Sequence, residues 1–145
     1  GPELAQIRQL AKPNIRILGW QSNEVVESYM AHAKGFVYAA YEDFGIAPVE
    51  AQACGTPVIA YGAGGTLETV RDVRHHGEMG TGILFEQQTE ADLTAAIAAF
   101  EEYQHQLKPD QVRSHALTFS PEVFRQRYLA HLEHCYQAFQ TERLQ

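Results

Sequence analysis

Residues 35–61 read GFVYAAYEDFGIAPVEAQACGTPVIAY, and they are the most informative residues about the fold. Two short apolar runs, 35–40 and 58–60, flank a segment with Pro48 near its start and Gly55 just past its end. Apolar runs of this length without alternation are typical of strands that are covered on both faces. Proline in the first helical turn and glycine after the last one mark the limits of a helix. The stretch therefore predicts a β–α–β unit of a parallel sheet.

The same alternation continues on both sides of this unit. Strands are expected at residues 15–18, 35–40, 58–60 and 83–85, and helices at 2–11, 23–32, 48–54, 66–73, 90–103, 110–118 and 121–141. Residues 74–81 are polar and rich in glycine, so we expect a mobile loop there. Thr89 and Ser120 are suitable N-caps for two of the helices. We predict one α/β domain over residues 1–145: a Rossmann-like parallel sheet with helices on both faces and a C-terminal helix at 121–141.

The composition narrows the class of protein. Apolar residues make up 45% of the chain and charged residues 20%, close to the average for globular proteins. The formal net charge of −7 argues against a nucleic-acid binder, which needs a basic surface to displace counterions. No apolar run approaches the ~20 residues of a membrane span. Cys54 and Cys135 have no pairing motif around them, which indicates a reduced, cytoplasmic location.

The segment 42–50 carries the most informative polar residues. It places Glu42 in the loop after a strand and Glu50 in the helix that follows. Gly45 allows a ligand to approach the backbone, and the free N–H groups at the helix start favour an anion such as pyrophosphate. Carboxylates accept hydrogen bonds from vicinal hydroxyls, so a ligand with both phosphate and sugar groups suits the segment. The simpler alternative is that both glutamates are ordinary acids near a helix N-terminus.

A second loop, residues 62–68, repeats this arrangement of glycines followed by a helix with an early acid. It is not the dinucleotide-binding fingerprint, because Leu67 occupies the position of the third glycine. Taken alone, this loop does not identify a ligand.

Together these residues resemble a known family. The run 42–60, with Glu42, Phe44-Gly45-Ile46 and Pro48-Val49-Glu50 in order, is similar to the E-x7-E region of family 4 (group 1) retaining glycosyltransferases. Gly64-Gly65, the segment 14–20 and the segment 81–85 agree with the same family, and the likeness covers residues 1–105. The resemblance implies the C-terminal, donor-binding half of a GT-B fold that lacks its first strand–helix–strand unit.

The resemblance also implies a role for each matched position. Glu42 is the expected catalytic residue, holding the hydroxyls of the donor sugar close to the anomeric carbon. Backbone N–H groups of Gly45 and Ile46 are expected to contact the sugar and diphosphate, and Glu50 the ribose. The other donor-binding positions are Leu18, Gly19 and Trp20 beside the base, and Gly65, Thr66 and Leu67 under the sugar or diphosphate.

The reaction implied is glycosyl transfer with retained configuration, with no metal and no cofactor besides the nucleotide-sugar substrate. Asp43, Gln52 and the segment 86–89 resemble mannosyltransferases that use GDP-mannose, with a glycan or lipid-linked acceptor. His131, His134 and Cys135 have metal-like spacing, but they lie on an amphipathic helix whose apolar side is expected to face inward. That side consists of Phe124, Tyr128, Leu132, Tyr136 and Phe139.

The basic pair that neutralises the diphosphate in this family has no match here, and neither does the acceptor-binding N-terminal domain. We therefore expect the isolated chain to be inactive or nearly so, with membrane association only through the full-length enzyme. The last helix is expected to self-associate in the absence of that domain.

Two other classes of function remain open. One is a non-catalytic nucleotide-binding or assembly module derived from the same fold. The other is a different enzyme of this fold, such as a nucleotide-sugar 2-epimerase or a glycogen phosphorylase. The pairing of Glu42 and Glu50 with 44–46 disfavours this second class, and no lysine indicates a pyridoxal phosphate site.

Overall fold

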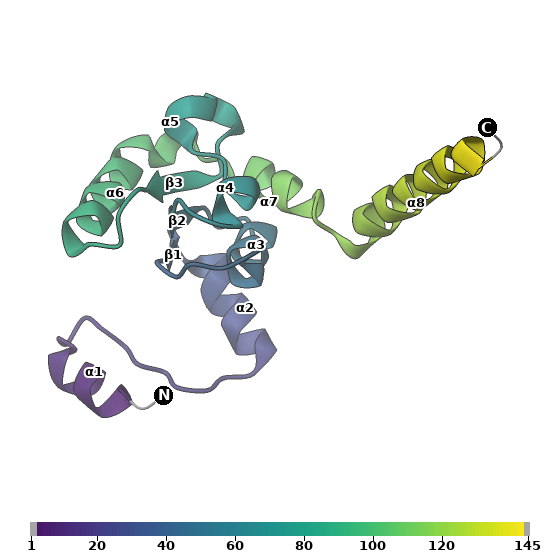
Figure 1. The fold of residues 1–145 in the computed structure, drawn as a ribbon. Helices are drawn as coiled ribbons and strands as arrows, with labels where there is room; N and C mark the ends of the chain where they lie inside the picture. Colours follow the sequence, from purple (N-terminus) through teal and green to yellow (C-terminus); the bar gives the residue numbers. More distant parts are fainter. Residues whose placement is uncertain (1–2, 144–145) are drawn as a thin grey trace.

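The computed structural model describes residues 3–143, and its centre is a three-stranded parallel sheet (Figure 1). The strands are β1 (Phe36–Tyr38), β2 (Val58–Tyr61) and β3 (Gly82–Phe85), in the order β1-β2-β3. Val37 pairs with Ile59, and Ile59 pairs with Ile83. The predicted α/β fold with a parallel sheet is confirmed.

Eight α-helices and two short 3-10 helices accompany the sheet within residues 3–143. They are α1 (Leu4–Leu10), α2 (Asn23–His32), α3 (Ile46–Ala53), α4 (Thr66–Thr69), α5 (Val73–His76), η1 (Gly77–Met79), α6 (Glu90–Tyr103), η2 (Gln104–Gln106), α7 (Pro109–Leu117) and α8 (Pro121–Arg143). Both α2 and α6 have the predicted limits, and the Thr89 hydroxyl caps α6 by accepting the N–H of Asp92. The start of the first helix, predicted at Pro2, lies outside the described residues.

The end of α3 follows the prediction from Gly55. This glycine has φ 85°, a left-handed conformation that costs residues with a Cβ about 1–2 kcal/mol. Its N–H donates to Gln52 O at 2.8 Å, and the N–H of Thr56 donates to Ala51 O at 3.0 Å. These are the two bonds of a Schellman motif, which satisfies the last carbonyls of the helix and turns the chain into β2.

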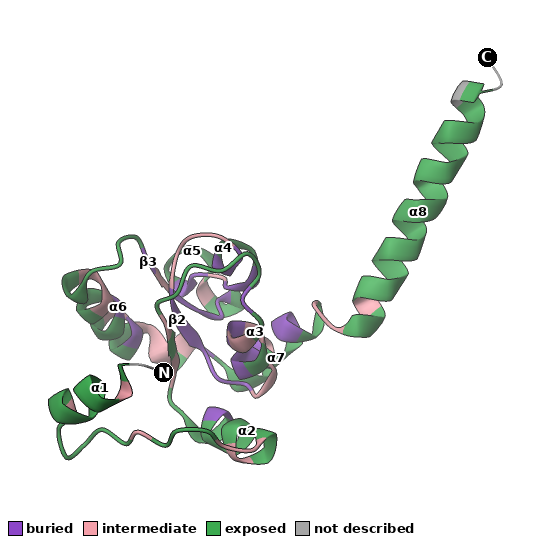
Figure 2. Cartoon of the chain, turned by 60° about the horizontal axis from the view of Figure 1, so that its bottom comes forward, coloured by how far each residue is buried: buried purple, intermediate pink, exposed green. Residues whose placement is uncertain are grey.

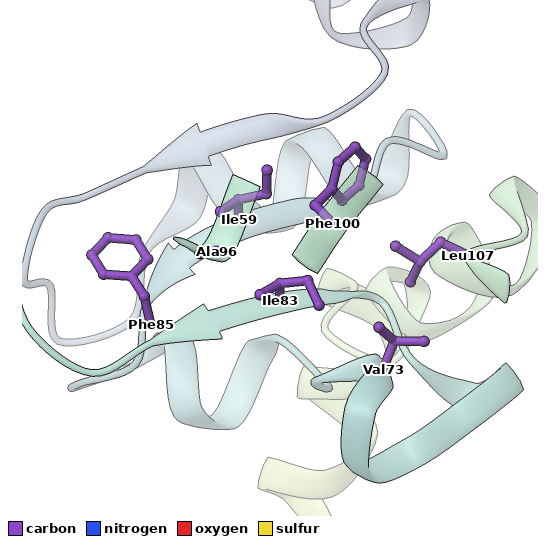
Figure 3. Packing of buried hydrophobic residues seen from close by; sticks show 7 residues of the cluster. All are labelled: Ile59, Val73, Ile83, Phe85, Ala96, Phe100 and Leu107. Atoms are coloured by element: carbon purple, nitrogen blue, oxygen red, sulfur yellow. The ribbon is translucent and has the colours of Figure 1, made fainter. Parts of the chain in front are cut away.

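Helices cover both faces of the sheet, as predicted. On one face α5 and α6 enclose a cluster that includes Ile59, Ile83 and Phe100 (Figure 3). On the other face α2 and α3 pack Met30 and Ala51 against the neighbouring β2 side chains. Alternate residues of β2 therefore enter opposite clusters, and its first three residues are all buried.

The strand predicted at residues 15–18 does not form. Ile15 and Leu18 are exposed, and Figure 1 shows this segment and α1 running apart from the sheet. An apolar run becomes a strand only where a neighbouring strand takes up its N–H and C=O groups. The apolar side chains of α1, Ile7 and Leu10, are exposed for the same reason: no described element lies against them.

The strand predicted at residues 35–40 is shorter than expected and is covered on one face only. Phe36 and Tyr38 pack on the cluster around Met30, but Val37 points the other way and is 47% exposed. β1 is an edge strand, and α6 packs on β3 and β2.

The helix predicted at residues 66–73 is broken in two at Val70, which is extended (φ −120°, ψ 128°). The carbonyl of Arg71 accepts the N–H groups of Thr81 and Gly82, and the Thr81 hydroxyl accepts the N–H of Arg71 at 3.0 Å. These long-range bonds replace helical ones. Much of the segment 74–81, predicted as a mobile loop, is helical in the structure, since α5 and η1 together cover residues 73–79.

Asp72 is the polar centre of this segment. One carboxylate oxygen accepts the N–H of Arg74 at 2.9 Å, and the other accepts the N–H of Leu84 at 2.9 Å and the Arg74 guanidinium at 2.6 Å. Burial by itself raises the pKa of Asp72, but the hydrogen bonds from Arg74 and Leu84 outweigh it and lower the pKa below its usual value.

We expect Asp72→Asn to lower the free energy of unfolding by about 2–3 kcal/mol at neutral pH, because it removes charged hydrogen bonds from a buried position. A lowered folded-state pKa gives stability that is present above the unfolded pKa of about 3.9 and is lost as the pH falls through the folded value. Urea unfolding at neutral pH and near pH 3 measures this. The gap between the two proteins should narrow in acid, and an equal gap at both pH values would contradict the assignment.

The last helix, α8, projects away from the rest of the chain (Figures 1 and 2). The apolar residues predicted to face inward are all exposed, by 46% to 66%: Phe124, Tyr128, Leu132, Tyr136 and Phe139. The inward face predicted from the spacing is therefore wrong, while the exposed apolar face on which the expected self-association depends is present. The spacing of apolar residues identifies the stripe but not a surface to cover it.

Candidate active site

The loops that follow β1 and β2 lie together at the carboxyl edge of the sheet. The N–H of Gly65 donates to Glu42 O at 2.8 Å, and Glu42 and Gly64 form an isolated parallel bridge. A Cβ on Gly64 would overlap the Glu42 carbonyl, and one on Gly65 would overlap the backbone of Phe44. The glycines of the second loop are needed because the first loop passes directly against them.

The loop after β3 joins the same edge. The side-chain amide of Gln88 donates to Ala39 O at 2.7 Å, so this loop is tied to the one that follows β1. The carboxyl ends of all three strands thus meet, which is where open parallel sheets bind ligands. The sequence offered no signal for this contact, because 49 positions separate the two residues.

The helix that begins at this edge, α3, is open to an anion. Gly45 precedes it with φ 80° and ψ 76°, and is buried. Among residues 3–143, no side chain caps this helix start. The backbone N–H groups at Ile46 and Ala47 and the positive end of the helix dipole therefore face a site where an anion can replace the cap. Ile46 is itself 68% exposed, so the approach is free.

Glu42 is exposed at the mouth of this site and lies beside Tyr38, the last residue of β1. Partial removal from water, and then the neighbouring Glu42 carboxylate with its negative charge, raise the pKa of the Tyr38 phenol. The phenol and the carboxylate therefore lie close together. Tyr38 was not foreseen as a site residue, since aromatic residues in a strand most often indicate core packing.

Glu50 lies in α3, one helical turn after Ile46, and lines a cavity between α2 and α3. The cavity has a volume of about 330 Å3, and its other lining residues are Asn23, Val26, Glu27, Met30, Ala53 and Cys54. Burial, and then the charge of Glu27, raise the pKa of the Cys54 thiol, with Arg113 acting in the opposite direction and Glu50 adding to the rise. A raised pKa makes this thiol a poor nucleophile.

An apolar cavity of about 360 Å3 adjoins the first one, with which it shares Val26 and Met30. Leu18 and Gly19 line it, so two of the three residues expected beside the base lie next to the Glu50 cavity. Trp20 lines neither cavity and is 90% exposed.

The three residues expected under the sugar or diphosphate differ in their surroundings. Gly65 is buried against Phe44. Thr66 is also buried, and its hydroxyl donates to Tyr61 O and to Ala63 O, so it holds its own loop in place. Leu67 is exposed and remains available to a ligand.

Two other features bear on the class of site. His131 Nε2 lies 3.5 Å from Cys135 Sγ on α8, but residues 3–143 contain no group of three or more side chains placed to hold a metal ion. Within the same residues, no helix is both long and apolar enough to cross a membrane.

A parallel three-stranded sheet flanked by helices, with loops that meet at its carboxyl edge, matches the architecture of GT-B glycosyltransferase structures. The model of the family "Glycosyl transferases group 1" matches residues 3–116, and the chain belongs to this family.

Curated relatives agree. A D-inositol 3-phosphate glycosyltransferase of Geodermatophilus obscurus is 39% identical over 96 residues, which are 66% of this chain and 20% of that protein. A protein of the same name from Acidothermus cellulolyticus is 44% identical over 50 residues, or 34% of this chain and 11% of the relative. The chain thus spans about a fifth or less of these relatives.

Solved structures show the same fold. The sucrose-phosphate synthase of Thermosynechococcus elongatus superposes with a TM-score of 0.72 at 27% identity, over 95% of this chain and 35% of that one. The catalytic domain of starch synthase IV from Arabidopsis thaliana, bound to ADP and acarbose, gives a TM-score of 0.63 at 20% identity over 82% of this chain and 26% of that one. This second likeness supports the fold alone.

Proposed function

We propose that this chain is the nucleotide-sugar-binding part of a retaining glycosyltransferase. The observation that carries the proposal is the uncapped start of α3, which follows directly on the Glu42 loop and lies one helical turn before Glu50, a lining residue of the first cavity. A ligand with a diphosphate between a sugar and a nucleoside has groups for all three places.

The chemistry follows from the positions. Glu42, which lies beside Tyr38, accepts hydrogen bonds from hydroxyls of the donor sugar. The N–H groups of Gly45 and Ile46 stabilise the negative charge that grows on the diphosphate as the glycosidic bond breaks. The dipole of α3 acts in the same direction. Glu50 accepts from the ribose hydroxyls, and the cavity beside Leu18 and Gly19 takes the base.

The donor proposed from the sequence is GDP-mannose, but two of the residues behind that choice have structural contacts. Gln52 is fully buried and donates to Pro48 O and Thr69 O. Gln88 donates to Ala39 O. Both side chains shape the site without facing a ligand, so mannosyl transfer from GDP-mannose now rests on Asp43 and the rest of the segment 86–89. The free thiols Cys54 and Cys135 support a cytoplasmic location.

We expect Glu50→Ala to weaken nucleoside diphosphate binding by about tenfold or more, since a hydrogen bond to a charged group contributes about 1.5–3 kcal/mol. The fold should be unaffected, because Glu50 is exposed. Calorimetry with GDP, UDP and ADP, each with and without the sugar, tests both the site and the donor base. Glu102→Ala, an exposed glutamate on α6, is the matched control. Equal affinity of Glu50→Ala and the parent would refute the ribose assignment.

The exposed apolar stripe on α8 supports a second candidate function, that of a non-catalytic assembly module. Such a module would self-associate through α8 whether or not a nucleotide is bound. Sedimentation of the chain and of Tyr128→Glu separates the two functions. Assembly that Tyr128→Glu abolishes, combined with no nucleotide binding at all, would favour this alternative.

A further inference from the structure

A chain of aromatic contacts connects the site to the junction between α7 and α8. The rings of Phe44, in the Glu42 loop, and Phe119 lie edge to face, with a centroid distance of 5.8 Å and an interplanar angle of 71°. The rings of Phe119 and His115 form a second pair of this kind, with a centroid distance of 5.3 Å and an interplanar angle of 88°. Edge-to-face pairs of this kind contribute about 0.5–1.5 kcal/mol beyond the area that they bury.

His115 anchors this chain of contacts. It is buried on α7, and its Nε2 lies 3.2 Å from Thr69 O. A carbonyl only accepts, so Nε2 carries the proton. The same carbonyl accepts the Gln52 amide at 2.9 Å, which joins α7, α4 and α3 at one point. Burial, followed by the charge of Arg71, lowers the pKa of His115, so the ring stays neutral at pH 7 and the contact persists.

Phe44 is held from two sides. Its backbone lies so close to Gly65 that a Cβ there would overlap it, and its ring rests on Phe119. A hollow of about 330 Å3 opens beside the pair, with Val123 and Tyr128 among its lining residues. Without the Phe119 ring, the Phe44 side chain has room to turn into this hollow, and the loop that carries Glu42 and Gly45 would turn with it.

We propose that Phe119 is a positioning residue of the donor site, acting on the Glu42 loop through Phe44. Phe119 contacts no proposed ligand position; it fixes the loop that does. Because it stands two residues before α8, in the short link from α7, the orientation of that helix is coupled to the geometry of the site. The expected effect of Phe119 on nucleotide binding rests on the proposed function. Its expected effect on the order of the Glu42 loop does not.

The test compares Phe119→Ala, Phe44→Ala and the double variant in the 145-residue chain. Binding of the nucleoside diphosphate preferred by the parent chain should weaken about tenfold in each, because the loop that carries Glu42 and Gly45 loses the aromatic contact that fixes it. The double variant should be no worse than Phe44→Ala alone, since Phe119 acts only through Phe44. Phe119→Tyr, which retains the ring, should bind like the parent.

A control separates positioning from plain stability. Phe100→Leu weakens the core against Gly35, at the start of β1 and at the opposite end of the strand from the site. It should lower the melting temperature without changing the affinity. Hydrogen exchange on the ligand-free protein provides the second readout: Phe119→Ala should speed exchange at residues 43–47 more than in β2 and β3, and Phe100→Leu should not.

The outcomes are distinct. If the parent chain binds no nucleotide, the proposed function fails, and exchange at 43–47 still decides whether Phe119 orders the loop. If the parent binds and Phe119→Ala binds equally well with unchanged exchange at 43–47, Phe119 is not a positioning residue. Additive losses in the double variant would also overturn the route through Phe44.

Discussion

Replacing Gly64 with alanine is expected to abolish measurable nucleotide binding while the sheet survives. Gly64 has φ 66°, and its place for a Cβ is already occupied by the carbonyl of Glu42. Overpacking of this kind costs about 1–3 kcal/mol, and the left-handed backbone adds about 1–2 kcal/mol for a residue with a Cβ. Relief is possible only by pushing the Glu42 loop away, which also moves the carboxylate.

Gly77→Ala is the matched control for this variant. Gly77 has φ 53° and ψ −130°, so alanine is strained there too, but no atom lies within 4 Å of its Cβ position. We expect it to lower the free energy of unfolding by about 1–3 kcal/mol and to leave the affinity unchanged. Gly64→Ala should lower both the free energy of unfolding and the affinity for the nucleotide. Urea unfolding and calorimetry on the two variants make the comparison, and equal affinities would show that the contact between the two loops does not shape the site.

The β–α–β unit from residue 35 to residue 61 was predictable because its signals are local. The proline in the first turn of α3, Gly55 after its end and the apolar run of β2 each act within a few residues. The limits of α6 were predictable for the same reason, since Thr89 caps the helix that it precedes. Where a neighbour in sequence supplies the partner, the sequence is sufficient.

Errors arose where the partner is distant or absent from the described residues. Residues 15–18 have the composition of a strand, but no strand pairs with them. Arg71 ends a helical run because its carbonyl binds residues ten and more positions away. The side chains of α8 have the pattern of a covered face and remain exposed. The spacing of apolar residues predicts which residues form an apolar face, but not whether another element covers that face.

Predictions for the site also succeeded where the signals are local and failed where the contacts are not. The order of its glutamates and glycines along the chain indicated the two loops, and the structure brings them together through the contact of Gly65 with Glu42. Gln88 and Phe119 were missed because each acts on a distant residue, Gln88 on Ala39 and Phe119 on Phe44. Tyr38 was missed because an aromatic residue in a strand most often indicates core packing. None of them belongs to a motif that local spacing can reveal.

The second large effect concerns catalysis. Given GDP-mannose or another nucleotide sugar and an acceptor alcohol, the 145-residue chain is expected to bind the donor yet transfer no sugar above the uncatalysed rate. Holding two reactants about 3–3.5 Å apart supplies about 7–11 kcal/mol of a typical enzymatic rate enhancement. The chain spans 35% of the sucrose-phosphate synthase chain that it resembles, and Glu42 lines none of the five cavities found in its described residues, so no element there is seen to hold an acceptor beside it.

Exposure of the site to solvent also lowers the expected rate of sugar transfer. Glu42, Ile46 and Leu67 all face solvent, so water competes for every hydrogen bond that would stabilise the departing diphosphate. Radiolabelled donor with product separation measures transfer, and Glu42→Ala is the control for any activity that appears. Turnover that Glu42→Ala abolishes would mean that this edge of the sheet is a sufficient active site. Turnover that survives Glu42→Ala would place the chemistry elsewhere in the chain, because a carboxylate next to the reacting carbon cannot be removed without loss of rate.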